Sequence, residues 1–105
     1  MTVKKQFNSF EEMLSGSDVA VLVDFYAEWC GPCQMMTPIL EKVNLQLKDR
    51  LRIVKIDTEK YSQLASQYEI TALPTLVLFK KGEPVDRIEG VMQAEQLIEH
   101  LRRLL

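Results

Sequence analysis

The residues of this sequence best suited to chemistry are its two cysteines, Cys30 and Cys33, which are separated only by Gly31 and Pro32. They stand at the junction between a strongly apolar predicted strand and a long predicted helix. On the first turn of a helix, residues three apart have Cα atoms about 5 to 6 Å apart, within the reach of a disulfide. The spacing therefore predicts a pair that passes between dithiol and disulfide without large backbone movement.

The start of a helix also distinguishes the two thiols. Free N–H groups and the helix dipole favour negative charge there, so Cys30 is the predicted attacking thiolate. Cys33, one turn further along the helix, is the predicted resolving thiol. We expect Gly31 to let the chain turn tightly, and Pro32 to fix one φ angle at a position that needs no helix hydrogen bond.

Three structural explanations of the cysteine pair compete with redox chemistry. Both residues could simply be small, buried apolar side chains. A structural zinc site needs about four ligands, but the sequence has no second cysteine pair, and its one histidine, His100, lies in the last predicted helix, where we expect it to be solvated. A static disulfide would stabilise little, because closing so short a loop removes little entropy from the unfolded chain. We therefore favour a redox pair and predict no metal site.

The elements that must position this pair alternate along the chain. Apolar and β-branched runs predict strands over 3–7, 19–26, 51–56, 75–79 and 85–88. Helical spacing predicts helices from the capping box at 9–12 through residue 14, over 33–48 with a kink at Pro38, over 62–68, and through the leucine-rich C-terminus. A turn is expected over 81–84. We expect one domain over residues 1–105.

Charge and hydropathy exclude two classes of function. The 13 basic and 15 acidic side chains are scattered without a basic stripe, so we expect no nucleic-acid partner. The longest apolar run, 19–23, is followed by Asp24, and it falls far short of the roughly 20 apolar residues of a membrane span. The first residues carry no signal-peptide pattern. We therefore predict a cytoplasmic protein with no membrane partner, or a plastid stromal one if the chain is a processed form.

The segment Asp24-Phe25-Tyr26-Ala27-Glu28-Trp29-Cys30-Gly31-Pro32-Cys33 resembles the active-site signature of the thioredoxin family. The resemblance extends over essentially the whole chain, including Pro38, Lys55, Leu73-Pro74-Thr75, Gly82 and Gly90. It implies an α/β fold in which a five-stranded mixed sheet is flanked by four helices. It also implies a cis Leu73–Pro74 peptide that faces the cysteines and exposes the backbone of Leu73 for pairing with a target peptide.

The resemblance also implies roles for further residues. Asp24 would lie beneath the disulfide with a raised pKa and would help to deprotonate Cys33, with Lys55 nearby. A carboxylate buried in a strand is costly to ionise, which suits exchange of protons near neutral pH. An apolar rim would receive the target, and its members are Trp29, Gly31, Pro32, Ala72, Leu73, Pro74, Gly90 and Val91.

The implied function is reduction of protein disulfides by a monomer without a bound cofactor. A separate thioredoxin reductase would return the electrons, either an NADPH-dependent flavin enzyme or a ferredoxin-dependent enzyme. Targets would include peroxiredoxins and methionine sulfoxide reductases. A binding module on the same fold would need neither thiol, and oxidants or isomerases typically carry a histidine between the cysteines, which raises the redox potential.

Four positions depart from many family members and leave the target preference open: Tyr26, Gln34, Thr58 and Glu89. The segments 54–61 and 87–93 resemble the y-type thioredoxins of cyanobacteria and chloroplasts. We therefore predict a y-type member.

Overall fold

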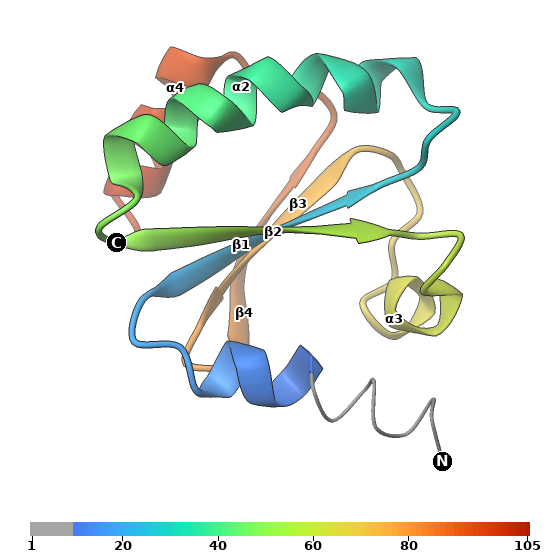
Figure 1. Cartoon of the computed structure of the whole chain (residues 1–105), viewed down its shortest axis with the longest axis horizontal. Helices are drawn as coiled ribbons and strands as arrows, with labels where there is room; N and C mark the ends of the chain where they lie inside the picture. Colours follow the sequence, from blue (N-terminus) through green and yellow to red (C-terminus); the bar gives the residue numbers. More distant parts are fainter. Residues whose placement is uncertain (1–9) are drawn as a thin grey trace.

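The computed structural model describes residues 10–105, which form a sheet with helices on both faces (Figure 1). The described strands are β1 (Ala20–Tyr26), β2 (Leu51–Asp57), β3 (Thr75–Lys80) and β4 (Glu83–Glu89). They lie in the order β2-β1-β3-β4, with β1 parallel to β2 and antiparallel to β3. The described helices are α2 (Gly31–Leu47), α3 (Ser62–Gln67) and α4 (Ala94–Arg102), and residues 10–15 are also helical. The mixed α/β architecture of the prediction is confirmed.

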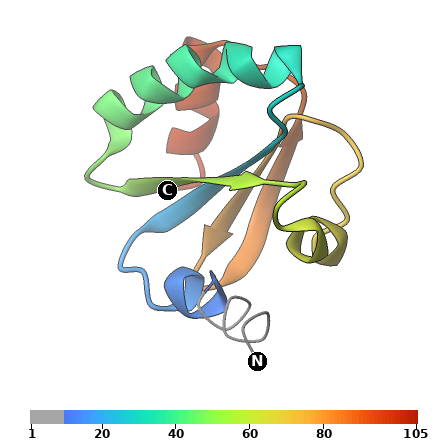
Figure 2. The same cartoon turned by 45° about the vertical axis from the view of Figure 1, so that its right-hand side comes forward.

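Side chains of the sheet alternate between two apolar layers, as the period of a strand requires. On one face, Leu22, Leu76 and Leu78 pack against α2 and α4. On the other face, Val23 and Phe79 belong to a second cluster that includes side chains of α3 and of the helix at 10–15. Figure 2 shows α2 and α4 together on one side of the sheet and the other two helices on the opposite side. Burial of β1 on both faces explains its unbroken apolar sequence.

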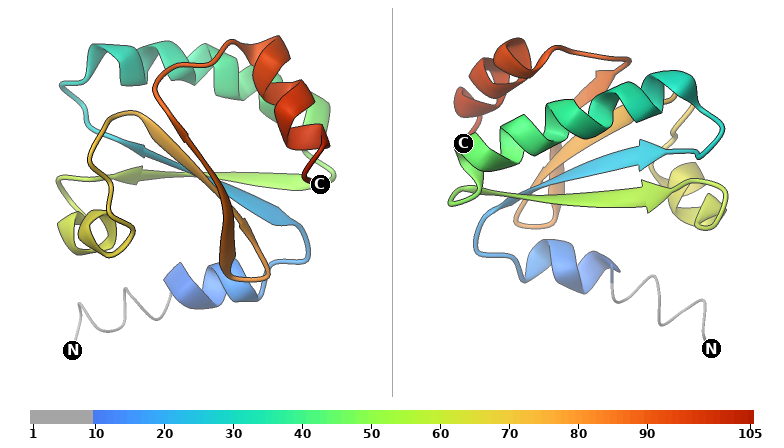
Figure 3. Two further views of the ribbon diagram at one scale, coloured as in Figure 1. Left: turned by 180° about the vertical axis from the view of Figure 1, so that it is seen from behind. Right: turned by 45° about the horizontal axis from the view of Figure 1, so that its top comes forward.

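The β3–β4 hairpin is tighter than the sequence predicts. Strand β4 begins at Glu83, two residues earlier than expected, so that only Lys81 and Gly82 form the turn. Both have positive φ angles, 52° and 85°, which is the geometry of a two-residue hairpin turn. The register shifts between Leu78 and Phe79, and Pro84 is tolerated because β4 is an edge strand beside this irregularity (Figure 3).

Other boundaries follow the prediction closely. Helix α2 begins at Gly31, two residues before the expected start, and continues through Pro38. Helix α3 ends at Gln67. The predicted strand over 3–7 lies outside the described residues, so the described sheet has four strands where we expected five in the whole chain. Within residues 10–105, no helix is long and apolar enough to cross a membrane.

Candidate active site

The two cysteines lie at the start of α2, directly after the loop that follows β1. Cys30 is the N-cap residue, and its side chain accepts a hydrogen bond from the backbone N–H of Cys33, with an N···Sγ distance of 3.2 Å. The two residues form a disulfide with a Cα–Cα separation of 5.3 Å, and each is only 5% exposed. The N–H of Cys33 in the first helical turn therefore points toward the sulfur of Cys30, where it would stabilise a negative charge after reduction.

The dipeptide between the cysteines is exposed and belongs to the first turn of α2. Pro32 sits where its missing N–H costs nothing, as predicted. The prediction that Gly31 is needed for a tight turn is not supported by the geometry. Its φ angle lies outside the left-handed region, and a Cβ atom built on it would meet no atom within 4 Å.

Asp24 is a buried carboxylate in the middle of the sheet. It is 1% exposed, and its Oδ1 atom has no hydrogen-bond partner among residues 10–105. Burial raises the pKa of Asp24 to about 6, and the positive charge of Lys55 lowers it by a smaller amount. Asp24 is two residues beyond Leu22 on the same strand, so its side chain points to the face that α2 covers. The helix that carries Cys33 thus lies over it.

Lys55 pairs with Asp24 in the register of β1 and β2. Its Nζ atom lies 4.9 Å from the centroid of the Tyr26 ring, which is a cation–π distance. Lys55 and Tyr26 line a pocket of about 410 Å³ together with Cys33 and Gln34. This contact of Tyr26 is not foreseen from the sequence, because the register partner of Tyr26 is Asp57, and Lys55 lies two residues before Asp57 on the same face of β2.

An apolar groove of about 460 Å³ opens beside Cys30. Its lining includes four members of the predicted rim, which are Trp29, Gly31, Pro32 and Leu73. Thr58, Ile70 and Thr71 also line it and were not predicted. They belong to loops after β2 and α3, whose position depends on tertiary packing more than on local sequence pattern.

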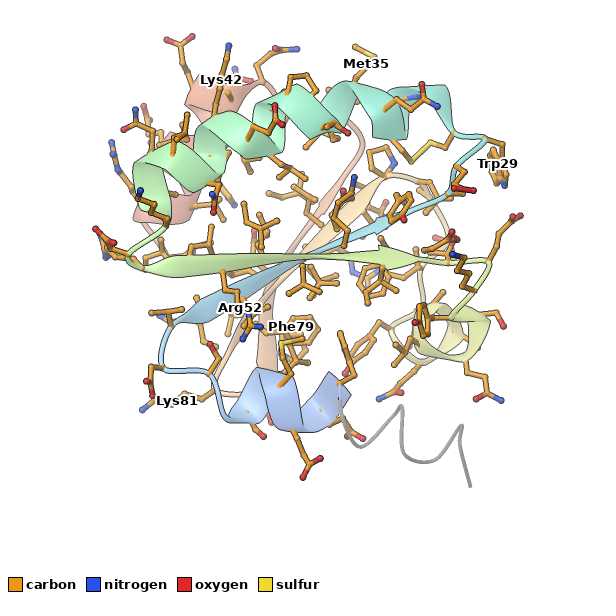
Figure 4. All side chains as sticks on the ribbon, in the orientation of Figure 1. Trp29, Met35, Lys42, Arg52, Phe79 and Lys81 are labelled. Carbon is orange, nitrogen blue, oxygen red and sulfur yellow. A yellow bond between two sulfur atoms is a disulfide. The ribbon has the colours of Figure 1, made fainter. Side chains whose placement is uncertain are left out.

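Trp29 lies at the outer edge of the molecule, beside the start of α2 (Figure 4). It is 69% exposed, and its indole Nε1–H donates a hydrogen bond of 2.8 Å to Oε2 of Glu59. The hydrogen bond fixes one edge of the ring and leaves the rest of its apolar surface free to contact a partner.

The remaining predicted members lie on the β3–β4 side of the groove. The Leu73–Pro74 peptide is cis, as the resemblance implied. Pro74 is buried, and its carbonyl accepts a hydrogen bond of 2.9 Å from the N–H of Gly90. Gly90 has a φ angle of +88°. Neither Pro74 nor Gly90 lines the groove itself; they support the segment that does. The other two predicted members, Ala72 and Val91, do not line the groove either.

His100 is partly solvated, with 37% of its side chain exposed. It also has a partner that the sequence does not predict, because its Nε2 atom lies 2.8 Å from Oδ2 of Asp86 and so connects α4 to β4. The pair is partly buried, which a sequence pattern does not reveal because Asp86 is distant in the chain. In the part of the chain that the structure describes, no group of three or more histidine, cysteine, aspartate or glutamate side chains is arranged to hold a metal ion.

Comparisons with known proteins agree with this geometry. Residues 1–103 match the family model described as Thioredoxin. A thioredoxin-like protein of Synechocystis sp. is 64% identical over 102 residues, which cover 97% of each chain. A chloroplastic Thioredoxin Y of Arabidopsis thaliana is 58% identical over 98 residues, which cover 93% of this chain and 57% of that relative. The chain therefore spans little more than half the length of that plant protein.

A solved structure gives the same result for the fold. The chain superposes on a mutant thioredoxin from Halobacterium salinarum with a TM-score of 0.82 at 38% sequence identity, covering 91% of this chain and 82% of the other.

Proposed function

The chain belongs to the thioredoxin family and is a thiol-disulfide oxidoreductase, and from that premise we propose that it reduces disulfide bonds in other proteins by means of Cys30 and Cys33. The observation that carries the proposal is the position of this pair, with one sulfur receiving an N–H at the start of α2 beside an apolar groove. We further propose that residues 1–105 act as one domain and as a monomer.

The reaction is a pair of thiol-disulfide exchanges. The Cys30 thiolate attacks one sulfur of the target disulfide; that S–S bond breaks, a mixed disulfide forms, and the other target sulfur leaves as a thiolate. Cys33 then loses its proton and attacks the Cys30 sulfur, which releases the second target thiolate. Two electrons and two protons have passed to the target, and the pair is left as the disulfide that the structure contains.

We assign the deprotonation of Cys33 to Asp24, with Lys55 as its charged neighbour. A carboxylate with a pKa of about 6 is mostly ionised at neutral pH and is still basic enough to accept a proton. Its burial beneath α2 and the unpartnered Oδ1 atom support this assignment. The pocket shared by Lys55 and Cys33 gives solvent a route by which the proton can leave.

The groove is the proposed binding surface for the target. Trp29, Gly31, Pro32 and Leu73 provide apolar contact around Cys30. Pro74 and Gly90 hold the Leu73 segment in place through their backbone hydrogen bond. The absence of a side chain on Gly31 keeps the approach to Cys30 open, which is a better reason for glycine here than chain flexibility.

Electrons must be supplied by a second protein. We propose a thioredoxin reductase of either the NADPH-dependent flavin type or the ferredoxin-dependent type, with no cofactor bound to this chain itself. Peroxiredoxins and methionine sulfoxide reductases are suitable targets because their catalytic cycles end in disulfides. We place the reaction in the cytoplasm or the plastid stroma, and the similarity to cyanobacterial and chloroplastic proteins supports the y-type assignment.

A redox titration of the Cys30–Cys33 couple against glutathione tests the direction of the reaction. A reductant is expected to have a potential close to that of the cytosolic glutathione pool or below it. A potential far above the pool would instead indicate an enzyme that introduces disulfides. Absence of redox cycling would favour the alternative of a binding module on the same fold.

A further inference from the structure

The wall of the groove opposite Trp29 is a segment without regular structure, residues 69–73. Ile70, Thr71 and Leu73 line the groove from this segment. Figure 2 shows it rising from α3 toward the end of the sheet where α2 begins. The segment is neither helix nor strand, and its backbone hydrogen bonds lie at its two ends, so its shape depends on how those ends are fixed.

The end nearest to β3 is fixed by local hydrogen bonds. The hydroxyl of Thr75 donates to the carbonyl of Ala72 at 2.5 Å, and the N–H of Gly90 donates to the carbonyl of Pro74 at 2.9 Å. These contacts hold Leu73 close to Cys30. They do not reach the other end of the segment.

The end nearest to α3 begins with an unusual residue. Glu69 has a φ angle of 54°, in the left-handed region, directly after the last turn of α3. The N–H of Glu69 bonds to the carbonyl of Ser66 at 3.0 Å, and that of Ile70 to the carbonyl of Ala65 at 2.9 Å. This is the helix-ending arrangement that normally uses glycine, because other residues meet a steric cost there. A glutamate adopts it only when its surroundings hold it.

Arg87 of the edge strand β4 provides that restraint. Its Nη1 atom donates to the carbonyl of Glu69 at 3.0 Å, and its Nη2 atom donates to the carbonyl of Tyr68. The Tyr68 ring is itself packed against Phe79, with centroids 5.3 Å apart. The guanidinium group thus joins β4 to the two carbonyls that immediately precede the groove wall.

We propose that Arg87 is a positioning residue for the recognition of protein disulfides. By binding the carbonyls of Tyr68 and Glu69, it keeps Glu69 left-handed and so fixes the wall formed by Ile70, Thr71 and Leu73. This inference rests on the proposed function. A polypeptide target must fit against the wall, whereas a small disulfide needs only access to the Cys30 sulfur, so the two kinds of substrate should respond differently when the restraint is removed.

The first test is Arg87→Met, which keeps the aliphatic stem and removes every donor. With insulin as the protein disulfide, we expect KM to rise about three- to tenfold, which corresponds to the net contribution of a typical hydrogen bond, while kcat stays within about twofold. Reduction of hydroxyethyl disulfide should be unchanged. Arg52→Met is the matched control, because Arg52, labelled in Figure 4, is an exposed residue of β2 and forms no side-chain hydrogen bond or ion pair with residues 10–105.

A second pair of substitutions tests the role of Glu69. In the Arg87→Met background, Glu69→Gly should return the KM for insulin to within about twofold of the wild type, because glycine adopts a positive φ without restraint. Glu69→Ala also removes the carboxylate but keeps a Cβ atom, so it should not rescue. Arg87→Lys, which keeps the charge but loses the planar fork, should give an intermediate KM.

Amide hydrogen exchange at Ile70 provides a readout that does not depend on activity. Exchange at Ile70 should be faster in Arg87→Met than in the wild type. Adding Glu69→Gly to Arg87→Met should slow it again. An unchanged KM for insulin in Arg87→Met, an equal loss with both substrates, or equal rescue by glycine and alanine would each overturn the role assigned to Arg87. If the wild type reduced neither substrate, the proposed function would fail, and the exchange rates would still show whether Arg87 restrains the wall.

Discussion

The face of the sheet beneath α2 and α4 is packed with aliphatic side chains and one buried carboxylate, whereas the opposite face combines aliphatic side chains with a group of aromatic rings. On the aromatic face, Phe10, Phe25, Tyr68 and Phe79 form four ring contacts with centroid distances between 5.3 and 6.3 Å. On the other face, Asp24 lies among leucines with one oxygen unpartnered in residues 10–105.

The two faces of this small sheet therefore differ in what they contribute: the aromatic face contributes stability, and the other face holds the group proposed for catalysis. Edge-to-face and tilted ring pairs add to the stability that burial alone provides. An ionised carboxylate in an apolar layer does the opposite, because it loses hydration without gaining a full set of partners. The proposed proton acceptor is therefore tolerated because the rest of the core compensates for it.

The largest expected effect is on catalysis at the dithiol. Cys30→Ser should abolish disulfide reduction, because the hydroxyl group cannot form a mixed disulfide. Cys33→Ser should retain the first attack and accumulate mixed disulfides on Cys30, which non-reducing electrophoresis with a disulfide-containing target will reveal. Equal accumulation in both variants would contradict the assignment of Cys30 as the nucleophile.

The next largest effect is on stability at the aromatic face. Phe79→Ala should lower the free energy of unfolding by about 3 to 5 kcal/mol, through loss of buried surface and creation of a cavity. Urea denaturation measures the change, and Val85→Ala is a control at a half-exposed position of the neighbouring strand. The rate of hydroxyethyl disulfide reduction per folded molecule should not change, because a small disulfide does not need the groove wall that follows Tyr68. A loss of catalysis in the folded variant would show that the two faces are not independent.

On the face beneath α2, Asp24→Asn should remove the free-energy penalty of burying an ionised carboxylate. The pKa of Asp24 is raised from 3.8 to about 6, so the folded state binds its proton more tightly than the unfolded state. This group therefore lowers stability above pH 6, and the penalty disappears as the pH falls toward 4. A shift of this size corresponds to about 3 kcal/mol at pH 7. The variant should be more stable at pH 7 by about 1 to 3 kcal/mol, since the buried amide still lacks partners.

The pH dependence gives the sharper result for Asp24. The difference in unfolding free energy between Asp24→Asn and the wild type should shrink between pH 7 and pH 4. Release of reduced target should be slower in the variant, with its pH profile altered around pH 6. A stability difference that does not vary with pH would mean that Asp24 keeps an ordinary pKa, and an unchanged turnover profile would remove it from the mechanism.

The parts of the fold predicted well from the sequence are those with local signals. The strand 19–26, the α2 stripe and the cysteine pair follow from residue type and spacing. The hairpin turn was placed too broadly, because Pro84 suggested a turn where an edge strand accepts proline. The roles of Asp24 and Lys55 and the cis bond came from family resemblance, since no local pattern determines them.

The parts of the site that were missed depend on contacts between distant segments. Glu59 reaches Trp29 across the groove, His100 pairs with Asp86, and Arg87 binds the end of α3. Each contact joins residues between 14 and 30 positions apart. Charged side chains on exposed positions carry no periodic signal, so only the packed structure shows which of them meet.

The smallest expected effects are on stability, at two glycines near the dithiol. They test whether the free space around a glycine or its backbone conformation decides if alanine is tolerated there. A Cβ atom built on Gly31 or on Gly90 would meet no atom within 4 Å outside the neighbouring residues. Only Gly90 has a positive φ angle, +88°. Gly31→Ala should stabilise the protein by at most about 0.5 kcal/mol, because alanine restricts the unfolded chain and favours the helix, whereas Pro32 disfavours helical geometry at a preceding residue with a Cβ atom. Gly90→Ala should destabilise it by about 1 kcal/mol, the left-handed penalty less the same unfolded-state gain. Thermal denaturation of the two variants measures the contrast directly. Changes of the same sign in both would mean that the backbone at Gly90 relaxes out of the left-handed region, and the N–H···O bond to Pro74 should then be lost, with faster amide exchange at Gly90.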